Sequence, residues 1–232
     1  MIERLLPAAA VAAEAFADEG DAGTLFAEER ALLAGMAPGR RAEFITVRGC
    51  ARRALGALGL PPAPVPRGPH GAPRWPAGLV GSLTHCEGYR AAVLARGAEL
   101  AAVGIDAEPH RALPPGVLDA VASPAERAAL ADLRRASPVV HWDRLLFSAK
   151  ESVYKAWYPL TGQRLDFADA EIAFALDGGW TAAVVPVSTP VSAPVSTPAL
   201  AGRWLTGGGL LLTAVAVEVA VAATDRDPRG VG

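Results

Sequence analysis

Two short segments of this chain combine acidic and basic side chains at spacings suited to phosphate chemistry. In the first, Asp106 and Glu108 are separated by one residue in an apolar stretch that ends at Pro109. Residues two apart on a strand point to the same side, so the two carboxylates would project together. Adjacent carboxylates repel unless one is protonated or a cation lies between them, and Mg²⁺ prefers such oxygen ligands. Two solvated acids in a strand-end turn remain the alternative.

The second segment contains the only two lysines of the chain, Lys150 and Lys155, with Glu151 between them. Every other strongly basic side chain is arginine, which suggests that a compact ammonium is needed here, for example against a phosphate. On a helix Glu151 and Lys155 are i,i+4 neighbours, and in isolation they would form a surface ion pair worth roughly a few tenths of a kcal/mol. Combined with the acids of the first segment, they favour a metal-bound diphosphate whose leaving group the lysines neutralise.

A third candidate is the hydroxyl–imidazole pair Thr84-His85 at the end of a predicted strand. Such a pair can bind a phosphate. Activation of a nucleophile by His85 is disfavoured because no acidic partner is apparent nearby in the sequence, and a structural histidine is the alternative. The arginines in the second predicted helix and in the loop after it would form either a second phosphate subsite or a solvated helix face. They are Arg40, Arg41, Arg48, Arg52 and Arg53 in the helix, and Arg67 and Arg74 in the loop.

The elements that must position these residues are both helical and extended. Apolar periodicity predicts helices over residues 24–36, 38–59, 123–135 and 139–157. Strands are predicted over residues 79–84, 89–95 and 100–105, with further strands within 167–176, 180–186 and 202–221. The mixture indicates an α/β protein. Residues 186–198 repeat a four-residue unit rich in proline, which blocks sheet pairing and predicts a mobile loop.

Composition narrows the class of protein. A chain of 232 residues can form one large domain or two small ones. Its net charge of -2 argues against general nucleic-acid binding. Two cysteines, Cys50 and Cys86, make neither a disulfide framework nor a CxxC metal site, so we expect a reduced, cytoplasmic setting. The first thirty residues carry acids and only short apolar runs, so neither a signal nor a membrane anchor is expected.

Three motifs, in order, resemble the signatures of the 4′-phosphopantetheinyl transferases. Residues 103–108 (VGIDAE) resemble that family's (V/I)G(I/V)D-x-E, and residues 147–155 (FSAKESVYK) resemble its (F/W)-(S/C)-x-K-E-(S/A)-x-x-K. Residues 75–86 (WPAGLVGSLTHC) are similar to the WPxGxxGSxSHC stretch of the enterobactin-synthetase component D group, and residues 48–55 to its R-x-x-A-x-x-AL helix. The resemblance covers residues 38–165, in the order and separation that the family shows.

The resemblance implies roles for individual residues. The acids that hold Mg²⁺ against the diphosphate of coenzyme A correspond to Asp106, Glu108 and Glu151. The lysines that face this diphosphate correspond to Lys155 and Lys150. Contacts near the 3′-phosphate correspond to Thr84 and His85, with Arg48 and Arg53 as cationic contacts to the same end. The implied catalytic set is therefore Glu151, Lys155 and Asp106, with Glu151 also helping to remove a proton from the acceptor.

The implied reaction moves the phosphopantetheine arm of coenzyme A onto a serine of an apo acyl or peptidyl carrier protein and releases adenosine 3′,5′-bisphosphate. Carriers of siderophore, polyketide or nonribosomal peptide synthesis all remain possible partners, and neither nucleic acid nor a membrane is expected as one. The implied fold is a pseudo-dimer of two similar α+β halves with coenzyme A between them. We place the halves at residues 1–102 and 103–232 and expect a monomer.

Some positions stay open at the level of sequence. Glu126 either assists the metal or completes a capping box with Ser123, and the Pro124 that follows favours the capping box. Ala72 stands where many relatives carry a basic residue, so Arg67 or Arg74 would supply the adenine-side contact. Two other classes of protein also fit the motifs: a Mg²⁺-dependent phosphodiesterase or nuclease, and a non-catalytic binder of carrier proteins.

Overall fold

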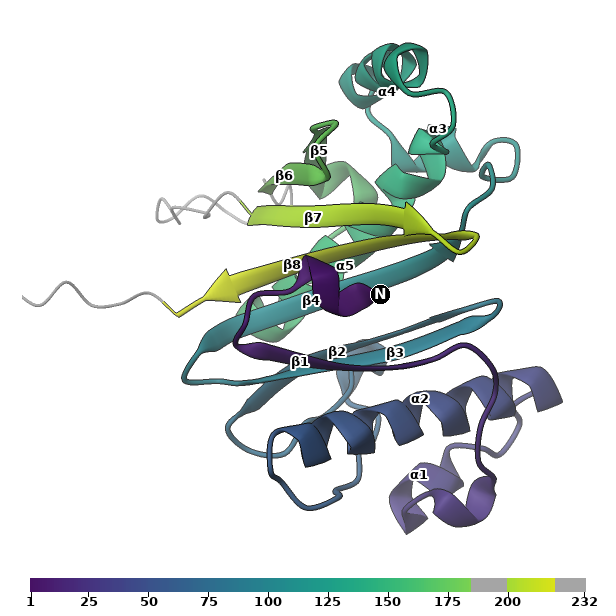
Figure 1. The fold of residues 1–232 in the computed structure, drawn as a ribbon, viewed down its shortest axis with the longest axis vertical. Helices are drawn as coiled ribbons and strands as arrows, with labels where there is room; N and C mark the ends of the chain where they lie inside the picture. The colour runs from purple at the N-terminus through teal and green to yellow at the C-terminus, as the bar shows by residue number, and fades with distance from the viewer. Residues whose placement is uncertain (185–199, 220–232) are drawn as a thin grey trace, which may run out of the picture.

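The computed structural model describes residues 1–184 and 200–219, so the predicted proline-rich loop at 186–198 lies outside the described residues. Two antiparallel sheets form the framework (Figure 1). The first has the order β1-β3-β2, with β1 Ala10–Ala15, β2 Leu79–Cys86 and β3 Tyr89–Arg96. The second has the order β4-β8-β7-β6-β5, with β4 Leu100–Pro109, β5 Ala170–Phe174, β6 Gly179–Val184, β7 Leu200–Gly207 and β8 Leu210–Glu218.

Helix α2 (Pro38–Ala57) covers the first sheet. It has proline in its first turn, where the missing N–H costs nothing. Its buried side packs on β1 and β3, as Figure 1 shows below the sheet. The buried apolar residues of this helix are Phe44, Ile45, Val47, Cys50, Ala51, Ala54 and Leu55. The sequence prediction of a helix over 38–59 is confirmed, and this helix carries five of the candidate arginines.

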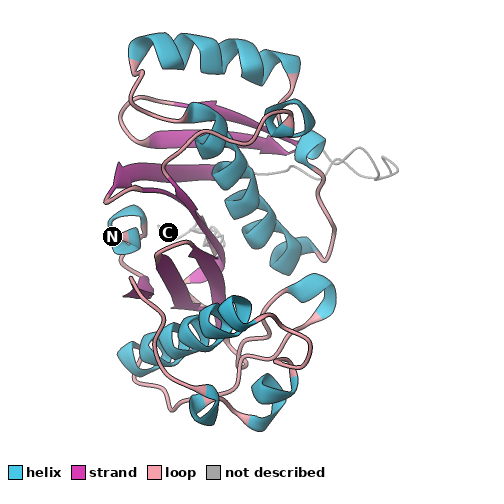
Figure 2. Ribbon diagram, turned by 90° about the vertical axis from the view of Figure 1, so that its right-hand side faces the viewer, coloured by secondary structure: helices cyan, strands magenta, loops and turns pink. Residues whose placement is uncertain are grey.

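Helix α5 (Trp142–Thr161) covers the second sheet and carries the lysine segment (Figure 2). It lies directly on β4 at Gly104, where a Cβ atom would be 2.0 Å from the Ser152 carbonyl oxygen. Only glycine permits this approach. On the neighbouring strand β8, the Thr213 hydroxyl lies 2.9 Å from the Ser148 hydroxyl and 2.7 Å from that of Ser152. These contacts fix the helix on the sheet beside Asp106.

The two sheets meet edge to edge at β2 and β4. Both are edge strands, and their hydrogen bonding is completed by side chains instead of a backbone ladder. The Ser82 hydroxyl accepts from the backbone N–H of Ile105 at 3.1 Å, and the Thr84 hydroxyl accepts from that of Ala107 at 3.0 Å. Two hydroxyls at alternate positions of β2 thus satisfy two alternate N–H groups of β4, which are buried and need partners.

The remaining helices differ in part from the sequence predictions. The predicted helix over 24–36 is only α1 (Ala27–Ala31), preceded by a 3-10 turn at Ala22–Thr24. Helix α4 (Pro124–Ala136) matches its prediction, whereas α3 (Val117–Val121) and strand β1 were not predicted. None of the helices in the described ranges is long and apolar enough to cross a membrane.

The mixed α+β class predicted from sequence is confirmed, and each sheet has its own long helix. The chain passes from the first sheet to the second between Arg96 and Leu100, close to the proposed division at residue 102. The division of the chain into two domains, residues 1–102 and 103–232, remains a prediction. What matters for function is that β2 with α2, and β4 with α5, face each other across the seam.

Candidate active site

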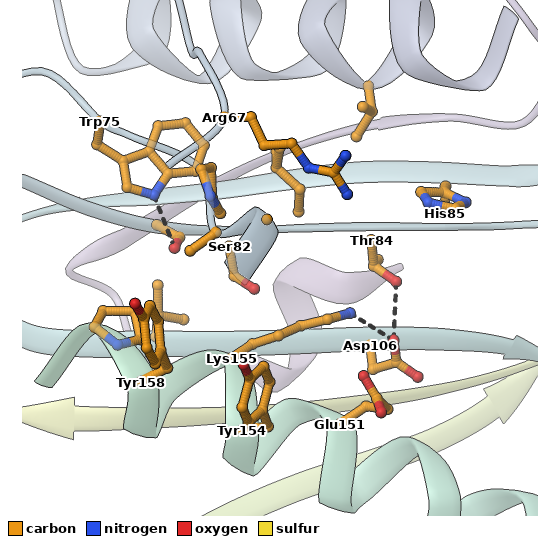
Figure 3. A pocket seen from close by; sticks show the side chains of 18 of the residues that line it. Arg67, Trp75, Ser82, Thr84, His85, Asp106, Glu151, Tyr154, Lys155 and Tyr158 are labelled. Atoms are coloured by element: carbon orange, nitrogen blue, oxygen red, sulfur yellow. Dashed lines mark hydrogen bonds and ion pairs between the residues drawn. The ribbon is translucent and has the colours of Figure 1, made fainter. Parts of the chain in front are cut away.

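A cleft of about 790 Å³ lies along the seam between the two sheets. Its lining comes from α2, β2, β4, α5 and the loop between α2 and β2 (Figure 3). Arg67 points into it from one side, and Lys155, Tyr154 and Tyr158 point into it from the other. The cleft therefore brings together residues of both halves that are far apart in sequence.

Asp106 is the central acid of the cleft. It lies on β4 and is 5% exposed. Its Oδ1 atom accepts from the Lys155 ammonium at 2.7 Å and from the Thr84 hydroxyl at 3.3 Å (Figure 3). Its Oδ2 atom is buried and has no hydrogen-bond partner among the described residues. A buried carboxylate oxygen without a partner is costly, so this atom is poised for a cation or donor that enters the cleft.

Lys155 and Glu151 lie on the same face of α5, as their spacing predicted, but they do not form a surface ion pair. The Lys155 ammonium donates to Asp106 and to the backbone carbonyl of Ile105 at 3.1 Å. Glu151 makes no side-chain hydrogen bond or ion pair within the described ranges of the chain, and it lines the cleft. Burial raises the pKa of the Glu151 carboxyl; Lys155 lowers it, and the neighbouring Asp106 and Glu108 raise it further.

Glu108 also lines the cleft but is held by an arginine that sequence reasoning did not single out. Arg144, in the first turns of α5, donates to Glu108 Oε2 at 2.6 Å. The same guanidinium donates to the carbonyls of Arg111 and Ala112, in the loop after β4. Burial and the nearby charge of Asp106 raise the pKa of Glu108, while Arg144 lowers it. Glu108 is thus an acid of the cleft with one oxygen committed to Arg144.

The opposite wall of the cleft is cationic. Arg48 is almost completely buried on α2; its Nε donates to the Val65 carbonyl at 2.9 Å, and its guanidinium lies over the Phe44 ring. Burial lowers the pKa of Arg48 to about 10, so it stays charged at neutral pH. Arg40 contacts the His85 ring, and burial together with Arg40 lowers the pKa of His85 to about 4. Arg67 lies on the same wall, which suits an anion.

The structure separates three predicted contacts from the cleft. Arg53 does not line the cleft; its guanidinium donates to Glu19 and to the Glu14 carbonyl of β1, each at 3.0 Å. Arg74 does not line the cleft, whereas Arg67 does. Lys150 is directed away from Asp106, into a buried ion pair with Glu126 at 2.8 Å. The prediction that Arg53 and Lys150 contact the coenzyme therefore does not fit their positions.

Glu126 itself acts as a capping residue, the preferred alternative from the sequence. The Ser123 hydroxyl accepts from the Glu126 N–H at 3.1 Å, and Glu126 Oε2 accepts from the Ser123 N–H at 2.8 Å. Both bonds of a capping box are present at the start of α4. This position does not support the other alternative, in which Glu126 assists the metal site.

The acids of the cleft suit a hard divalent cation, although they are not preassembled around one. Over residues 1–184 and 200–219, no three His, Cys, Asp or Glu side chains come close enough together to form a metal-binding cluster. The donors are nevertheless all carboxylate oxygens, the type that Mg²⁺ prefers, and Mg²⁺ usually takes only one or two of them from the protein. The unpartnered Oδ2 of Asp106 and the free carboxylate of Glu151 therefore fit Mg²⁺.

Comparison with known proteins gives the family. Residues 28–95 match a family model described as the 4′-phosphopantetheinyl transferase N-terminal domain, and residues 102–198 match the 4′-phosphopantetheinyl transferase superfamily model. The chain belongs to the 4′-phosphopantetheinyl transferase superfamily. It is similar to the 4′-phosphopantetheinyl transferase Svp of Streptomyces mobaraensis, with 52% identity over 100% of this chain and 95% of the relative.

Two further relatives carry the same activity in their names. The transferase PptT of Mycobacterium tuberculosis (strain ATCC 25618 / H37Rv) is 52% identical over 81% of this chain and 84% of its own length. The transferase Npt of Nocardia iowensis is 45% identical over 93% of this chain and 99% of its own. The predicted family is thus confirmed, and the chain is an enzyme of the phosphopantetheinyl transferase type.

Sequence reasoning singled out Thr84 as a phosphate contact, but it missed Arg144 and the role of Ser82 and Thr84 in the seam. Arg144 gave no signal, because its partner Glu108 lies 36 residues away in sequence. The hydroxyls of Ser82 and Thr84 did give one: two hydroxyls at alternate positions of an edge strand indicate that this edge pairs through side chains.

Proposed function

We propose that this transferase moves the 4′-phosphopantetheine arm of coenzyme A onto a serine of an apo acyl or peptidyl carrier protein, releasing adenosine 3′,5′-bisphosphate. The observation that carries the proposal is Asp106, a cleft residue whose Oδ1 binds the Lys155 ammonium and whose buried Oδ2 has no hydrogen-bond partner in the described part of the chain. An acid that needs a cation, next to a fixed ammonium, suits a metal-bound diphosphate.

The charge of the cleft is divided in a way that suits coenzyme A. Carboxylates lie on β4 and α5, whereas Arg40, Arg48 and Arg67 lie on the opposite wall. Coenzyme A carries a diphosphate and a separate 3′-phosphate, and both need neutralising at a distance from each other. In the proposed complex the arginine wall binds the 3′-phosphate and the acid wall faces the diphosphate.

Asp106 and Glu151 would hold Mg²⁺, with Glu108, anchored by Arg144, completing or supporting the set. The metal, when bound, supplies charge neutralisation of the phosphate oxygens. The Lys155 ammonium is held beside Asp106 by a hydrogen bond. There its fixed positive charge would stabilise the negative charge that develops on the leaving group. Thr84 orients Asp106 through its hydroxyl.

Glu151 is the residue proposed to take the proton of the acceptor serine, directly or through a water molecule. Burial raises its pKa, which moves a carboxylate towards the range in which a general base is effective. It is also free of side-chain partners in the part of the chain that the structure describes, so it can turn towards the acceptor.

The test is to mix purified protein with Mg²⁺, coenzyme A and each of several apo carrier proteins from peptide, polyketide and siderophore synthesis, and to weigh the carriers by mass spectrometry. The expected result is a gain of one phosphopantetheine on at least one carrier, which Asp106→Ala abolishes and Asp132→Ala, an exposed acid on α4, leaves intact. No gain on any carrier would refute the proposal. Release of nucleotide without a carrier product would favour the phosphodiesterase alternative.

A further inference from the structure

Lys150, which precedes Glu151, occupies a buried site outside the cleft. Its ammonium donates three hydrogen bonds, each of 2.8 Å: to the Val121 carbonyl, to Glu126 Oε2 and to the Phe167 carbonyl. Its side chain is only 2% exposed and that of Glu126 only 1%. All three N–H groups of the ammonium are therefore used inside the protein, which leaves none for a ligand.

The partner acid extends the same network. Glu126 Oε1 accepts from the backbone N–H of Ile172 at 2.8 Å, while Oε2 accepts from Ser123 and from Lys150. The Lys150–Glu126 pair thereby joins five elements: the end of α3, the start of α4, helix α5, the 3-10 helix at Phe167–Asp169, and strand β5. A buried pair with every donor and acceptor satisfied holds its surroundings rigidly, whereas loss of one partner leaves an uncompensated charge.

This geometry explains why the chain keeps lysine at this position. An ammonium presents three donors that can point at three separate oxygens around a small sphere. The guanidinium of arginine is larger and planar, with its donors in a fixed fork, so it cannot reproduce this arrangement in the same volume.

The network bears on the active site because it holds α5 from the side opposite the sheet. Gly104 and the hydroxyls that meet Thr213 fix the sheet side of the helix, and Lys150 fixes its outer side. Glu151 lies between these anchors. The Phe167 carbonyl also belongs to segment 164–167. Together with Lys150 this segment lines a cavity of about 190 Å³ that shares Glu151 and Tyr154 with the main cleft.

From this geometry we infer that Lys150 is a positioning residue: with Glu126 it fixes the place of Glu151 and of the wall formed by segment 164–167, and it does not contact coenzyme A. The inference rests on the proposed function, because Glu151 is taken to act in phosphopantetheine transfer. Its effect should appear in turnover and not in binding of the nucleotide end of the substrate.

The test is a double-mutant cycle of Lys150→Met and Glu126→Gln in the full chain. Four quantities are measured for each variant: the melting temperature, kcat, KM for coenzyme A, and the Kd of adenosine 3′,5′-bisphosphate by calorimetry. Each single variant is expected to lower kcat by about ten- to a hundredfold, the usual effect of displacing a reacting group by about 1 Å. The Kd of the bisphosphate should change by less than about twofold, and the double variant should be little worse than either single one.

Two controls separate positioning from other roles. Leu130→Ala removes a buried side chain from α4 and should lower the melting temperature while kcat, measured well below it, stays near wild type. Lys150→Arg keeps the charge and should not restore kcat. Retained kcat in Lys150→Arg would mean that the position needs only a positive charge and not the three separately directed donors of an ammonium.

The outcomes are distinct. Retained kcat in Lys150→Arg, a weaker bisphosphate Kd in Lys150→Met, or kcat losses that simply add in the double variant would each overturn the inference. So would a lowered melting temperature with kcat near wild type in Lys150→Met, which is the pattern expected of Leu130→Ala. If Lys150→Met does not fold, Glu126→Gln and Lys150→Arg carry the same comparison. Absence of transfer by the wild-type protein would instead refute the proposed function itself.

Discussion

Thr84→Val tests whether the seam between β2 and β4 orients the central acid of the cleft. The Thr84 hydroxyl is almost fully buried; it accepts from the Ala107 N–H at 3.0 Å and donates to Asp106 at 3.3 Å. Valine has nearly the same shape but neither donor nor acceptor. The substitution therefore leaves a buried N–H of β4 without an acceptor and removes one of the two groups that hold the carboxylate.

The size of the effect follows from these two contacts. Leaving a buried N–H unsatisfied costs about 1–3 kcal/mol, and the bond to Asp106 is long, so it adds only about 1 kcal/mol. We expect the free energy of unfolding to fall by about 2–4 kcal/mol in total. For a chain of this size each kcal/mol shifts the melting temperature by about 2–4 °C, which gives a decrease of about 4–16 °C. Turnover should fall as well, because Asp106 loses its orientation.

The assay is thermal and urea unfolding of Thr84→Val beside Thr84→Ser, with transfer rates measured well below the midpoints. Serine keeps the hydroxyl and loses only a methyl group, so its stability and turnover should stay close to wild type. If the valine variant melted within about 2 °C of the serine variant and kept its turnover, the proposed role of the hydroxyl in the seam would be wrong.

Three further predictions follow from the geometry of the cleft. Gly104→Ala should destabilise the protein by about 3 kcal/mol or more in urea unfolding, because the new methyl group would lie 2.0 Å from the Ser152 carbonyl oxygen. Gly56→Ala is the control, because the space around Gly56 is open and the protein should not be destabilised. Lys155→Arg should lower the initial transfer rate at least about tenfold, since a planar guanidinium replaces a compact charge; full activity would contradict the role of the point charge. Finally, burial lowers the pKa of His85 to about 4, so its neutral form is favoured in the folded state. The neutral His85 side chain contributes its full stabilisation above about pH 6.5, and this stabilisation is lost as the pH falls towards 4. Between about pH 6.5 and pH 4 the free energy of unfolding of the wild type should therefore fall relative to that of His85→Gln, and above pH 6.5 it should not.

Elements with a strong and regular pattern were predictable from the sequence. Helix α2 and strands β2 and β3 lie within a few residues of their predicted bounds, because apolar periodicity and the glycine and proline signals agree there. Strand β1 (Ala10–Ala15) was missed, since it is mostly alanine, which favours helix in isolation. Its six residues all pair with β3, and this tertiary pairing overrides the local preference. In segment 24–36 a helix was predicted that is longer than the one observed. The leucines of this segment have a helical spacing and pack against Phe44, but the helix ends at Ala31.

The sequence by itself determined the family, and it predicted the acids of the site, Lys155 beside them, and which of these residues are neighbours along one strand or one helix. Those relations depend only on local geometry, with a period of two on β4 and of four on α5. Only the tertiary structure decided which charges pair: Lys155 with Asp106, Lys150 with Glu126, and Arg144 with Glu108. Each pair joins residues between 24 and 49 positions apart. Their distances are set by how closely α5 lies on β4 at Gly104 and by where α4 packs. The two lysines separate because residues five apart on a helix point about 140° apart.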